Sequence, residues 1–566
     1  MVGRRAATER HGRGQRPAGR QTRRRTSIQR HPPTPSVGRR AQVRVSYPLT
    51  RVLTHLRGTG RMRLPARAWQ TRTARLARRR AATTLRRAAR TVAPVTRSLA
   101  QVVGAPGAAR DADTAALQRS VWALALPAIG EQLLALAVGL SDTFLSGHLS
   151  DVAAHHLGYG RTEAVAAIGA AATVVWVVVT AFFAINVGIT AVMARATGAQ
   201  DRTLAQRTTA QGMLLGIGAG LLLAALAVPL AEVVSSLIGL KGEIATLAAG
   251  YIRVLSLALP ATGIASAANA AMRGAGDTRR PMLVMLVVNG ANILGSWLLL
   301  NGLPRLGIPA IGVLGSATGA AAGWVLGALI AVWFLRQTHP RAPRLIWTAL
   351  RPQRETIARI LRVGLPSTVE LMVFQLGVVT FVRFVVGLGP TDYAAYVAIN
   401  SVESIGTLPA FGFSVAATAL VGQALGAGDP DLAARSTWAT LRPCLAVVFA
   451  IAFCALVIPQ VVLGLFVDDP SVLAAGSLAM RMSVLTIPAS AAAFVFNGAL
   501  RGAGDTTFPV VVRASGTWGM RVPLALLLIP LLALPGGRLV MALDYSTQAG
   551  LAYWRFRSGR WQRARV

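Results

Sequence analysis

Four acidic residues lie deep inside long apolar segments, where a charge is costly and therefore points to function. Glu131 and Asp142 fall in the first apolar segment, Glu370 in the seventh and Glu403 in the eighth. Burial disfavours the ionised form of a carboxyl group, so such an acid can take up and release a proton. These residues predict cation chemistry inside a membrane.

The first two acids are expected on one helix face. Eleven residues, close to three helical turns, separate Glu131 from Asp142, which corresponds to roughly 16 Å along a helix. We interpret Asp142, beside Ser141 and Thr143, as an ion-coupling residue, together with Glu131. The alternative is that Asp142 only caps the outer end of its helix.

The second half carries its acids differently. Glu370 occupies the place in its segment that Glu131 holds in the first, but eleven residues further on stands Phe381. Because we expect little buried basic charge nearby, Glu370 and Glu403 are predicted to attract cationic substrates. Arg383 leaves open a structural ion pair with either acid. Two further residues are candidates for the substrate cavity, namely Asn186 and Phe411.

One phrase occurs twice, as Arg273-Gly274-Ala275-Gly276-Asp277-Thr278 followed by Pro281, and as Arg501-Gly502-Ala503-Gly504-Asp505-Thr506 followed by Pro509. This marks an internal duplication. Glycines permit a tight cytoplasmic turn, Asp and Thr are expected to cap the next helix, and proline suits its first turn. The phrase is assigned to fold and gating rather than catalysis, through Arg273, Gly274, Gly276, Asp277, Arg501, Gly502, Gly504 and Asp505.

The elements that must position these residues are membrane helices. Hydrophobic residues make up 53% of the chain and its mean hydropathy is +0.51. Twelve apolar stretches approach the roughly 20 residues that cross a bilayer. They lie near residues 121–146, 163–190, 209–232, 244–268, 282–301, 311–335, 360–387, 393–421, 438–466, 472–499, 508–532 and 537–555.

Arginine clusters follow the even-numbered stretches, and the other loops are neutral to acidic. The positive-inside rule therefore puts both termini in the cytoplasm. Six spans per half predict a parallel repeat of two lobes, 118–340 and 356–566, joined by a cytoplasmic linker at 341–355. The fold class is an all-α polytopic membrane protein.

The net charge of +38 comes largely from the first part of the chain, since about 28 of the 59 Lys and Arg residues precede residue 111. Residues 1–113 are expected to be a disordered tail, in which residues 66–90 have the composition of a basic helix at a membrane surface. Its composition also fits a transit peptide or an over-extended gene start. We expect no nucleic acid as partner.

Several motifs of other protein classes are missing from the sequence. It has no GxxxxGK[ST] phosphate loop, no GxSxG elbow and no metal-ligand spacing. An ATP-driven pump or an enzyme is therefore disfavoured, and we expect no metal site and no cofactor beyond a coupling ion, H⁺ or Na⁺.

The combined motifs resemble those of the multidrug and toxic compound extrusion (MATE) transporters over roughly residues 118–561. They are Ala137-Val138-Gly139-Leu140-Ser141-Asp142-Thr143, the repeated RGAGDT phrase, and Val421-Gly422-Gln423-Ala424-Leu425-Gly426. The resemblance implies a twelve-helix, two-lobed carrier that exports organic cations in exchange for protons or sodium. It places the family's first-span carboxylate on Asp142 and its seventh-span acid on Glu370, and it adds Gln423 to the gating residues. Departures are the extra loop 150–162 and the polar Gly536-Gly537-Arg538.

These observations together predict a monomeric multidrug antiporter in the plasma (cell inner) membrane, with small organic cations and the bilayer as partners. A flippase for lipid-linked saccharides would need a cationic cavity, for which Arg383 is a candidate. A membrane enzyme or a nucleic-acid-tethering protein would depend on other polar motifs or on the basic tail.

Overall fold

Helices form the regular structure of the computed structural model, which describes residues 106–303, 307–337 and 345–564. Within these ranges the one β-type backbone pairing is an isolated antiparallel bridge between Leu303 and Ile308. The expectations for the basic tail before residue 106 lie outside the described residues.

The N-terminal lobe begins earlier than expected, because its first helix starts at Pro106 instead of near residue 118. The loop expected at 150–162 contains a short helix, capped at its start by Ser150. The span expected at 244–268 is two helices that meet at a bend of 52°. The helices of this lobe are α3 (Pro106–Gly147), α4 (Asp151–Leu157), α5 (Arg161–Gly198), α6 (Arg202–Leu237), α7 (Gly242–Leu257), α8 (Leu259–Gly274), α9 (Arg279–Asn301) and α10 (Gly312–Arg336).

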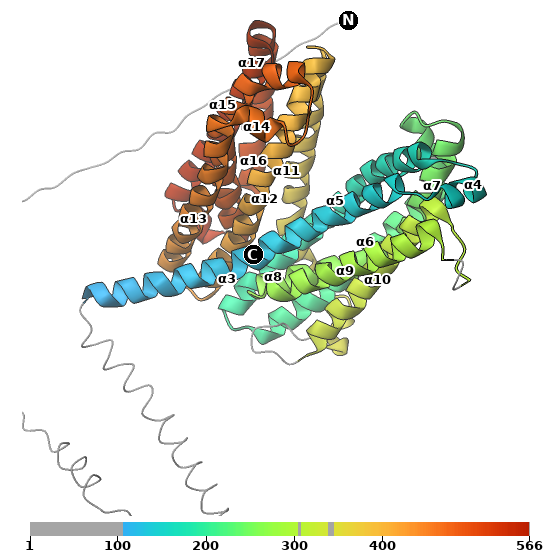
Figure 1. Cartoon of the computed structure of the whole chain (residues 1–566). Coiled ribbons are helices and arrows are strands. Elements are labelled where there is room, and N and C mark those ends of the chain that lie inside the picture. Colours follow the sequence, from blue (N-terminus) through green and yellow to red (C-terminus); the bar gives the residue numbers. More distant parts are fainter. Residues whose placement is uncertain (1–105, 304–306, 338–344, 565–566) are drawn as a thin grey trace, which may run out of the picture. The chain divides into compact units, whose positions relative to one another are not determined.

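The C-terminal lobe follows the short 3-10 helix η2 (Trp347–Leu350). Figure 1 shows α3 of the first lobe running from beside α13 to beside α9. The remaining elements are α11 (Arg354–Val386), α12 (Pro390–Gly426), α13 (Pro430–Val457), α14 (Pro459–Leu463), α15 (Pro470–Ala503), α16 (Thr507–Gly516), the π-helical turn η3 (Thr517–Arg521), α17 (Val522–Arg557) and the 3-10 helix η4 (Arg560–Arg563).

The long helical run Thr507–Arg557 reverses direction inside α17. Ala533 has non-helical backbone angles, φ 50° and ψ −137°. Before and after this break, Arg521 bonds to Asp544 and Arg513 to Gln548. The residue further before the break, Arg513, pairs with the residue further after it, Gln548. The two parts, or arms, of the run therefore lie antiparallel to each other.

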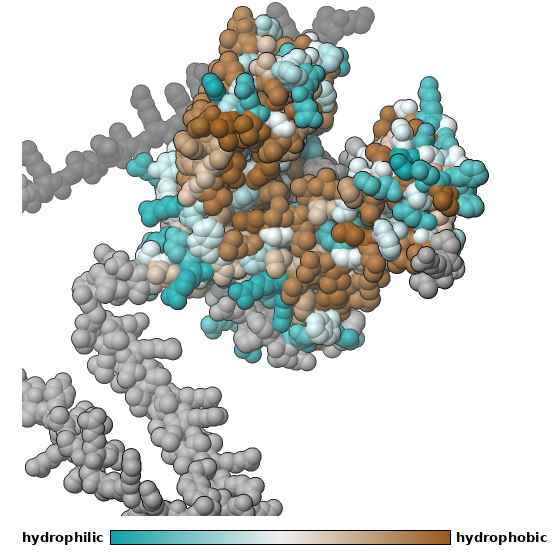
Figure 2. Space-filling view, viewed as in Figure 1, coloured by the Kyte–Doolittle hydropathy of each residue, from teal (hydrophilic) through white to brown (hydrophobic). Residues whose placement is uncertain are grey.

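Ten helices in the described part of the chain are long and apolar enough to cross a membrane, or eleven if the bent α7–α8 pair is one span. Hydrophobic side chains cover much of the visible helix surface, and hydrophilic ones gather near the helix ends (Figure 2). The all-helical, multi-pass prediction is confirmed.

Each lobe contains two apolar clusters, and one cluster of each pair includes residues of the opposite lobe. Val121, Leu124 and Ala125 of α3 join a cluster of the C-terminal lobe. Ile360 of α11 joins a cluster of the N-terminal lobe. The other two clusters draw on one lobe each among the described residues. The lobes therefore share a core near the end that carries the repeated phrase.

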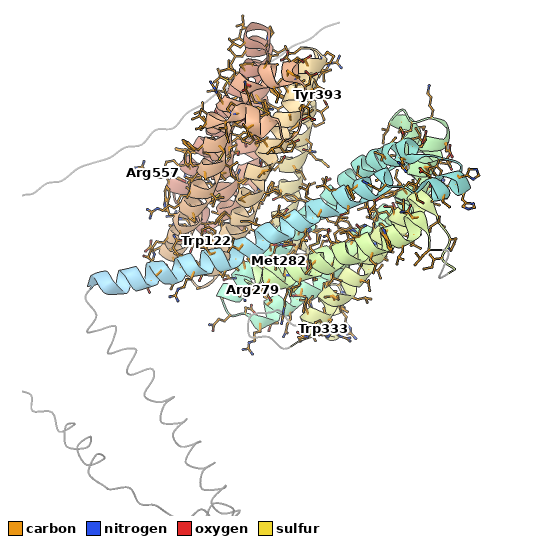
Figure 3. All side chains as sticks on the ribbon, viewed as in Figure 1. Trp122, Arg279, Met282, Trp333, Tyr393 and Arg557 are labelled. Carbon is orange, nitrogen blue, oxygen red and sulfur yellow. The ribbon has the colours of Figure 1, made fainter. Side chains whose placement is uncertain are left out.

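Glycines allow the helices of the two lobes to touch at this end. A Cβ at Gly198 would overlap the carbonyl oxygen of Gln423, and a Cβ at Gly426 would overlap that of Arg195. Trp122 of α3, labelled in Figure 3, packs edge-on against Phe413 of α12 with 5.4 Å between ring centroids. Close backbone contact of α5 with α12 thus needs residues without a side chain.

Candidate functional site

Asp142 lies in a buried polar cluster of the N-terminal lobe. Its carboxylate accepts hydrogen bonds from side chains on three other helices, and only 3% of the residue is exposed. The donors are the Tyr251 hydroxyl of α7 at 2.8 Å, the Asn292 amide of α9 at 3.0 Å, the Ser296 hydroxyl of α9 at 3.3 Å and the Ser316 hydroxyl of α10 at 3.2 Å. These contacts join α3 to neighbouring helices, so the carboxylate does not serve as a helix cap.

No guanidinium or ammonium pairs with Asp142 within the described ranges. The other buried carboxylates there each have an arginine partner. The amide oxygen of Asn292 beside Asp142 is also buried and accepts no hydrogen bond. This site therefore combines an uncompensated acid with a free acceptor, a set of groups suited to a proton or a small cation.

Glu131 has a different environment from Asp142, although both lie on α3. Its carboxylate forms an ion pair with Arg273 at the end of α8. The two acids therefore contact different helices, and Glu131 is neutralised by the first residue of the repeated phrase.

Glu370 repeats this arrangement in the second half. It pairs with Arg501 at 3.1 Å and lies 3.7 Å from Arg513. Arg501 occupies the position in the second phrase that Arg273 holds in the first. The expectation of little buried basic charge near these acids is wrong, because the duplicated phrase itself supplies the arginine.

Glu403 is paired as well. Arg538 donates to its carboxylate at 2.8 Å, and the Ser483 hydroxyl donates at 2.7 Å. Arg538 also donates to the Asn400 side chain, and its side chain is 0% exposed. Arg383 is exposed on α11, and Glu370 and Glu403 pair with Arg501 and Arg538 instead, so the ion pair with Arg383 that the sequence left open does not form. This ion pair explains the polar Arg538, and the adjacent Gly536 leaves room for the carbonyl oxygen of Leu528.

Sequence reasoning missed several members of these clusters. Arg513, Arg521 and Asp544 are ionisable residues in apolar segments, the same signal that identified Asp142. Arg521 bonds to Asp544 at 2.6 Å, and Arg513 bonds to Gln548 at 2.8 Å. The hydroxyls around Asp142 carry no such signal, because Ser and Tyr are common in helices.

The two remaining substrate candidates, Asn186 and Phe411, make no hydrogen bond to the buried acids in the described part of the chain. Asn186 of α5 is half-buried, and its side-chain oxygen is buried without a partner. Phe411 of α12 is 38% exposed and packs on Phe494 at 4.5 Å. Phe494 in turn lies 5.7 Å from the Arg513 guanidinium, so an aromatic pair connects Phe411 to the Glu370 cluster.

The repeated phrase forms a tight turn in both halves. Gly276 and Gly504 have φ of +86° and +87°, a left-handed conformation that glycine adopts without strain. The Asp277 carboxylate accepts from the backbone N–H groups of Arg279 and Arg280, each at 3.2 Å.

Two details of the predicted capping are wrong. Neither Thr278 nor Thr506 makes a side-chain cap. Asp505 bonds instead to Arg555 of α17 at 2.8 Å. The second copy thus ties the turn to the last long helix, while in the first copy the aspartate stabilises the helix that follows.

The turns also face the opposite lobe. Gln423 of α12 donates to the carbonyl oxygen of Gly274 at 3.0 Å. Arg195 of α5 donates to the carbonyl oxygens of Ala503 at 2.9 Å and Ala564 at 3.1 Å. A side chain of each lobe therefore donates a hydrogen bond to the repeated RGAGDT turn of the other lobe.

A family model, curated relatives and solved structures all match the two helical lobes of this chain. The MatE family model matches residues 127–298 and 366–527. The probable multidrug resistance protein NorM of Thermotoga maritima is 31% identical over 460 residues, covering 80% of this chain and 94% of the relative.

Two solved structures show the same fold. One is an outward-facing multidrug resistance MATE family transporter of the MOP superfamily, with a TM-score of 0.70 at 20% identity, covering 78% of this chain and 97% of that one. The other is a MOP superfamily transporter from Pyrococcus furiosus, whose reversed binding-pocket polarity suggests a different function. It has a TM-score of 0.69 at 20% identity and covers 78% of this chain and 95% of that one.

The duplicated helical lobes and their buried charges define a membrane transporter. The chain belongs to the MATE (MatE) family of multidrug efflux transporters, as the sequence motifs predicted.

Proposed function

We propose that the protein is a secondary active exporter that exchanges organic cations or drugs for protons or sodium by alternating access. The observation that carries this proposal is the Asp142 cluster, in which a buried carboxylate has four donors and no basic partner within the described part of the chain. Reversible neutralisation of such an acid by a bound cation is a way to couple an ion gradient to movement.

Twelve spans are part of this proposal. The bent α7–α8 pair counts as one span, and the two arms of Thr507–Arg557 count as two. The arginine-rich ends, which include Arg195, Arg273 and Arg501, then lie in the cytoplasm, as the positive-inside rule requires. Both termini are cytoplasmic in this arrangement, and the protein is a monomer of the plasma (cell inner) membrane.

Contact between the lobes at the cytoplasmic end supports a state that opens to the outside. In the inward-open state, a cation enters from the cytoplasm and binds beside Phe411 and Asn186. Its charge is met by Glu370 or Glu403 only when the arginine partners of these acids release them. After the lobes rock outward, ion binding at Asp142 lowers the affinity for the drug, which leaves.

Efflux of a fluorescent organic cation from vesicles that contain the full chain tests the proposal. Proton and sodium gradients are collapsed separately, and Asp142→Asn is compared with Asp431→Asn, an exposed residue near the start of α13. We expect export to depend on one gradient, and Asp142→Asn alone to lose that dependence. Unchanged gradient-driven export in Asp142→Asn would refute the role of this acid.

A flippase for lipid-linked saccharides is the second candidate, favoured by the buried arginines of the C-terminal lobe, Arg501, Arg513, Arg521 and Arg538. Each of them lies beside a carboxylate, so the interior offers little free positive charge for a phosphate. Failure to export cations under any gradient, together with movement of a labelled lipid-linked saccharide across the same vesicles, would favour this candidate.

A further inference from the structure

A cavity of about 690 Å³ lies between residues 113–120 of α3 and residues 432–442 of α13, and it shares no residue with the Asp142 cluster. Arg435 and Arg442 line it from α13, and Asp113 lines it from α3. The remaining lining residues are Thr114, Ala116, Leu117, Gln118, Ser120, Leu432, Trp438 and Ala439. The cavity therefore combines two guanidinium groups with one carboxylate and an apolar surface.

Arg435, Trp438 and Arg442 lie on one face of α13, because spacings of three and four residues place side chains on the same side of a helix. All three are exposed. Neither arginine forms a hydrogen bond or ion pair with another described residue, in contrast to the buried arginines of this lobe. Two guanidiniums on one face of a membrane helix are thus available to an external anion.

Aromatic side chains place this cavity at the level of lipid headgroups. Trp438 packs on Tyr553, 6.1 Å between ring centroids, and the adjacent Trp554 is 58% exposed. Trp and Tyr concentrate where a bilayer meets water. With 28 residues, α13 is about 42 Å long and exceeds a hydrocarbon core of about 30 Å, so its first two turns, which include Arg435, extend into the headgroup region. Arg442 lies about 10 Å further along the helix, and its long side chain reaches toward the same level.

The lining chemistry selects a lipid over a free phosphate ion. Leu117, Leu432 and the Trp438 ring offer apolar contacts that an inorganic ion does not use. Asp113 and Gln118 supply acceptors for a headgroup hydroxyl, and the two arginines suit a phosphate. The arginine-rich sequence before residue 111 is a poor occupant, since it carries the same sign of charge.

We propose that this cavity binds the headgroup of an anionic phospholipid, with its phosphate at Arg435 and Arg442 and its glycerol and upper acyl chains along Trp438 and Leu117. The proposal rests on the membrane orientation given under the proposed function, which makes this the inner leaflet. It does not depend on which substrate is exported.

The test measures lipid retention directly by native mass spectrometry of the purified full chain, supplied with phosphatidylglycerol or phosphatidylcholine. Arg435→Gln/Arg442→Gln is compared with Arg202→Gln/Arg207→Gln, which removes the same charge from exposed positions of α6. We expect the first variant to bind phosphatidylglycerol about 10- to 30-fold more weakly, because each surface arginine strengthens binding to anionic lipid several-fold. The control and Arg435→Lys/Arg442→Lys should retain most of the binding.

Three results would overturn the proposal. They are equal retention of the two lipids by the native protein, equal loss in both double glutamine variants, and displacement of bound phosphatidylglycerol by excess inorganic phosphate. Because none of these readouts uses transport, a failed efflux experiment with intact lipid binding would count against the proposed function alone.

Discussion

Arg195 and Gln423 occupy equivalent positions in the two halves, 228 residues apart, and each donates a hydrogen bond to the repeated phrase of the opposite lobe. Their acceptors, the carbonyl oxygens of Ala503 and Gly274, differ by one residue in the repeat. The contact between the lobes is thus crosswise and nearly symmetric, although the side chains that make it have diverged.

Removing this contact should weaken the closed cytoplasmic end. A part-buried hydrogen bond of this kind contributes about 1–3 kcal/mol when its partner is left unsatisfied. We therefore expect Gln423→Ala, and more strongly Gln423→Ala with Arg195→Gln, to shift the population toward the inward-open state about 5- to 100-fold. Spin labels at positions 202 and 431, with Cys444 and Cys454 replaced, would report longer distances. Gln460→Ala, an exposed change at the start of α14, should leave the distances unaltered.

The glycines of the same contact give a second prediction. Alanine at Gly198 or Gly426 places a methyl group against a backbone carbonyl of the other lobe, which has no flexible atom to move away. Each substitution should separate α5 from α12 and deplete the outward-open state. Gly218→Ala on α6, where a Cβ would meet no atom within 4 Å, is the matched control. Accessibility of single cysteines to a water-soluble maleimide measures the effect, and equal labelling of all three variants would contradict it.

Backbone strain differs between equivalent turns of the two lobes. Gln200 has φ 57° where the second half has Gly428 with φ 77°. A left-handed conformation costs a non-glycine residue about 1 kcal/mol. Gln200→Gly should therefore raise the thermal stability slightly and Gly428→Gln should lower it, both measured as melting temperatures in one detergent. Destabilisation by Gln200→Gly would mean that the exposed Gln200 side chain contributes more than its backbone strain costs.

Breaking the Arg538–Glu403 ion pair should lower the stability of the protein strongly when only the arginine is removed, and much less when both charges are removed. Arg538→Gln leaves the largely buried Glu403 carboxylate with the Ser483 hydroxyl but without its charged partner, which costs about 3 kcal/mol. The melting temperature should fall markedly and recover in the double variant Arg538→Gln/Glu403→Gln. Arg359→Gln breaks an exposed pair with Glu355 and should cost less than about 1 kcal/mol. A similar fall in melting temperature in the Arg538→Gln and Arg359→Gln variants would show that burial does not determine how much an ion pair contributes to stability.

The helices, the duplication and the acids that lie within apolar helices can be predicted from the sequence. Hydropathy, identical phrases and charges in apolar segments are all local signals. The sequence does not predict the partners. Glu131 and Glu370 meet their arginines only after the chain folds so that the ends of α8 and α15 reach α3 and α11, and the donors to Asp142 come from three helices. The bend between α7 and α8 was also missed, since the apolar pattern continues across it.

The antiparallel arms of Thr507–Arg557 bear on how this segment enters the bilayer during synthesis. A lone arginine at the centre of a membrane helix costs about 2.5–3.5 kcal/mol to insert. Arg521 and Asp544 stand on the two arms and bond to each other, so a hairpin that inserts as one unit carries an already neutralised pair. Release of the first arm alone would expose Arg521 to lipid, and this makes the pair a reason for the last two spans to be integrated together.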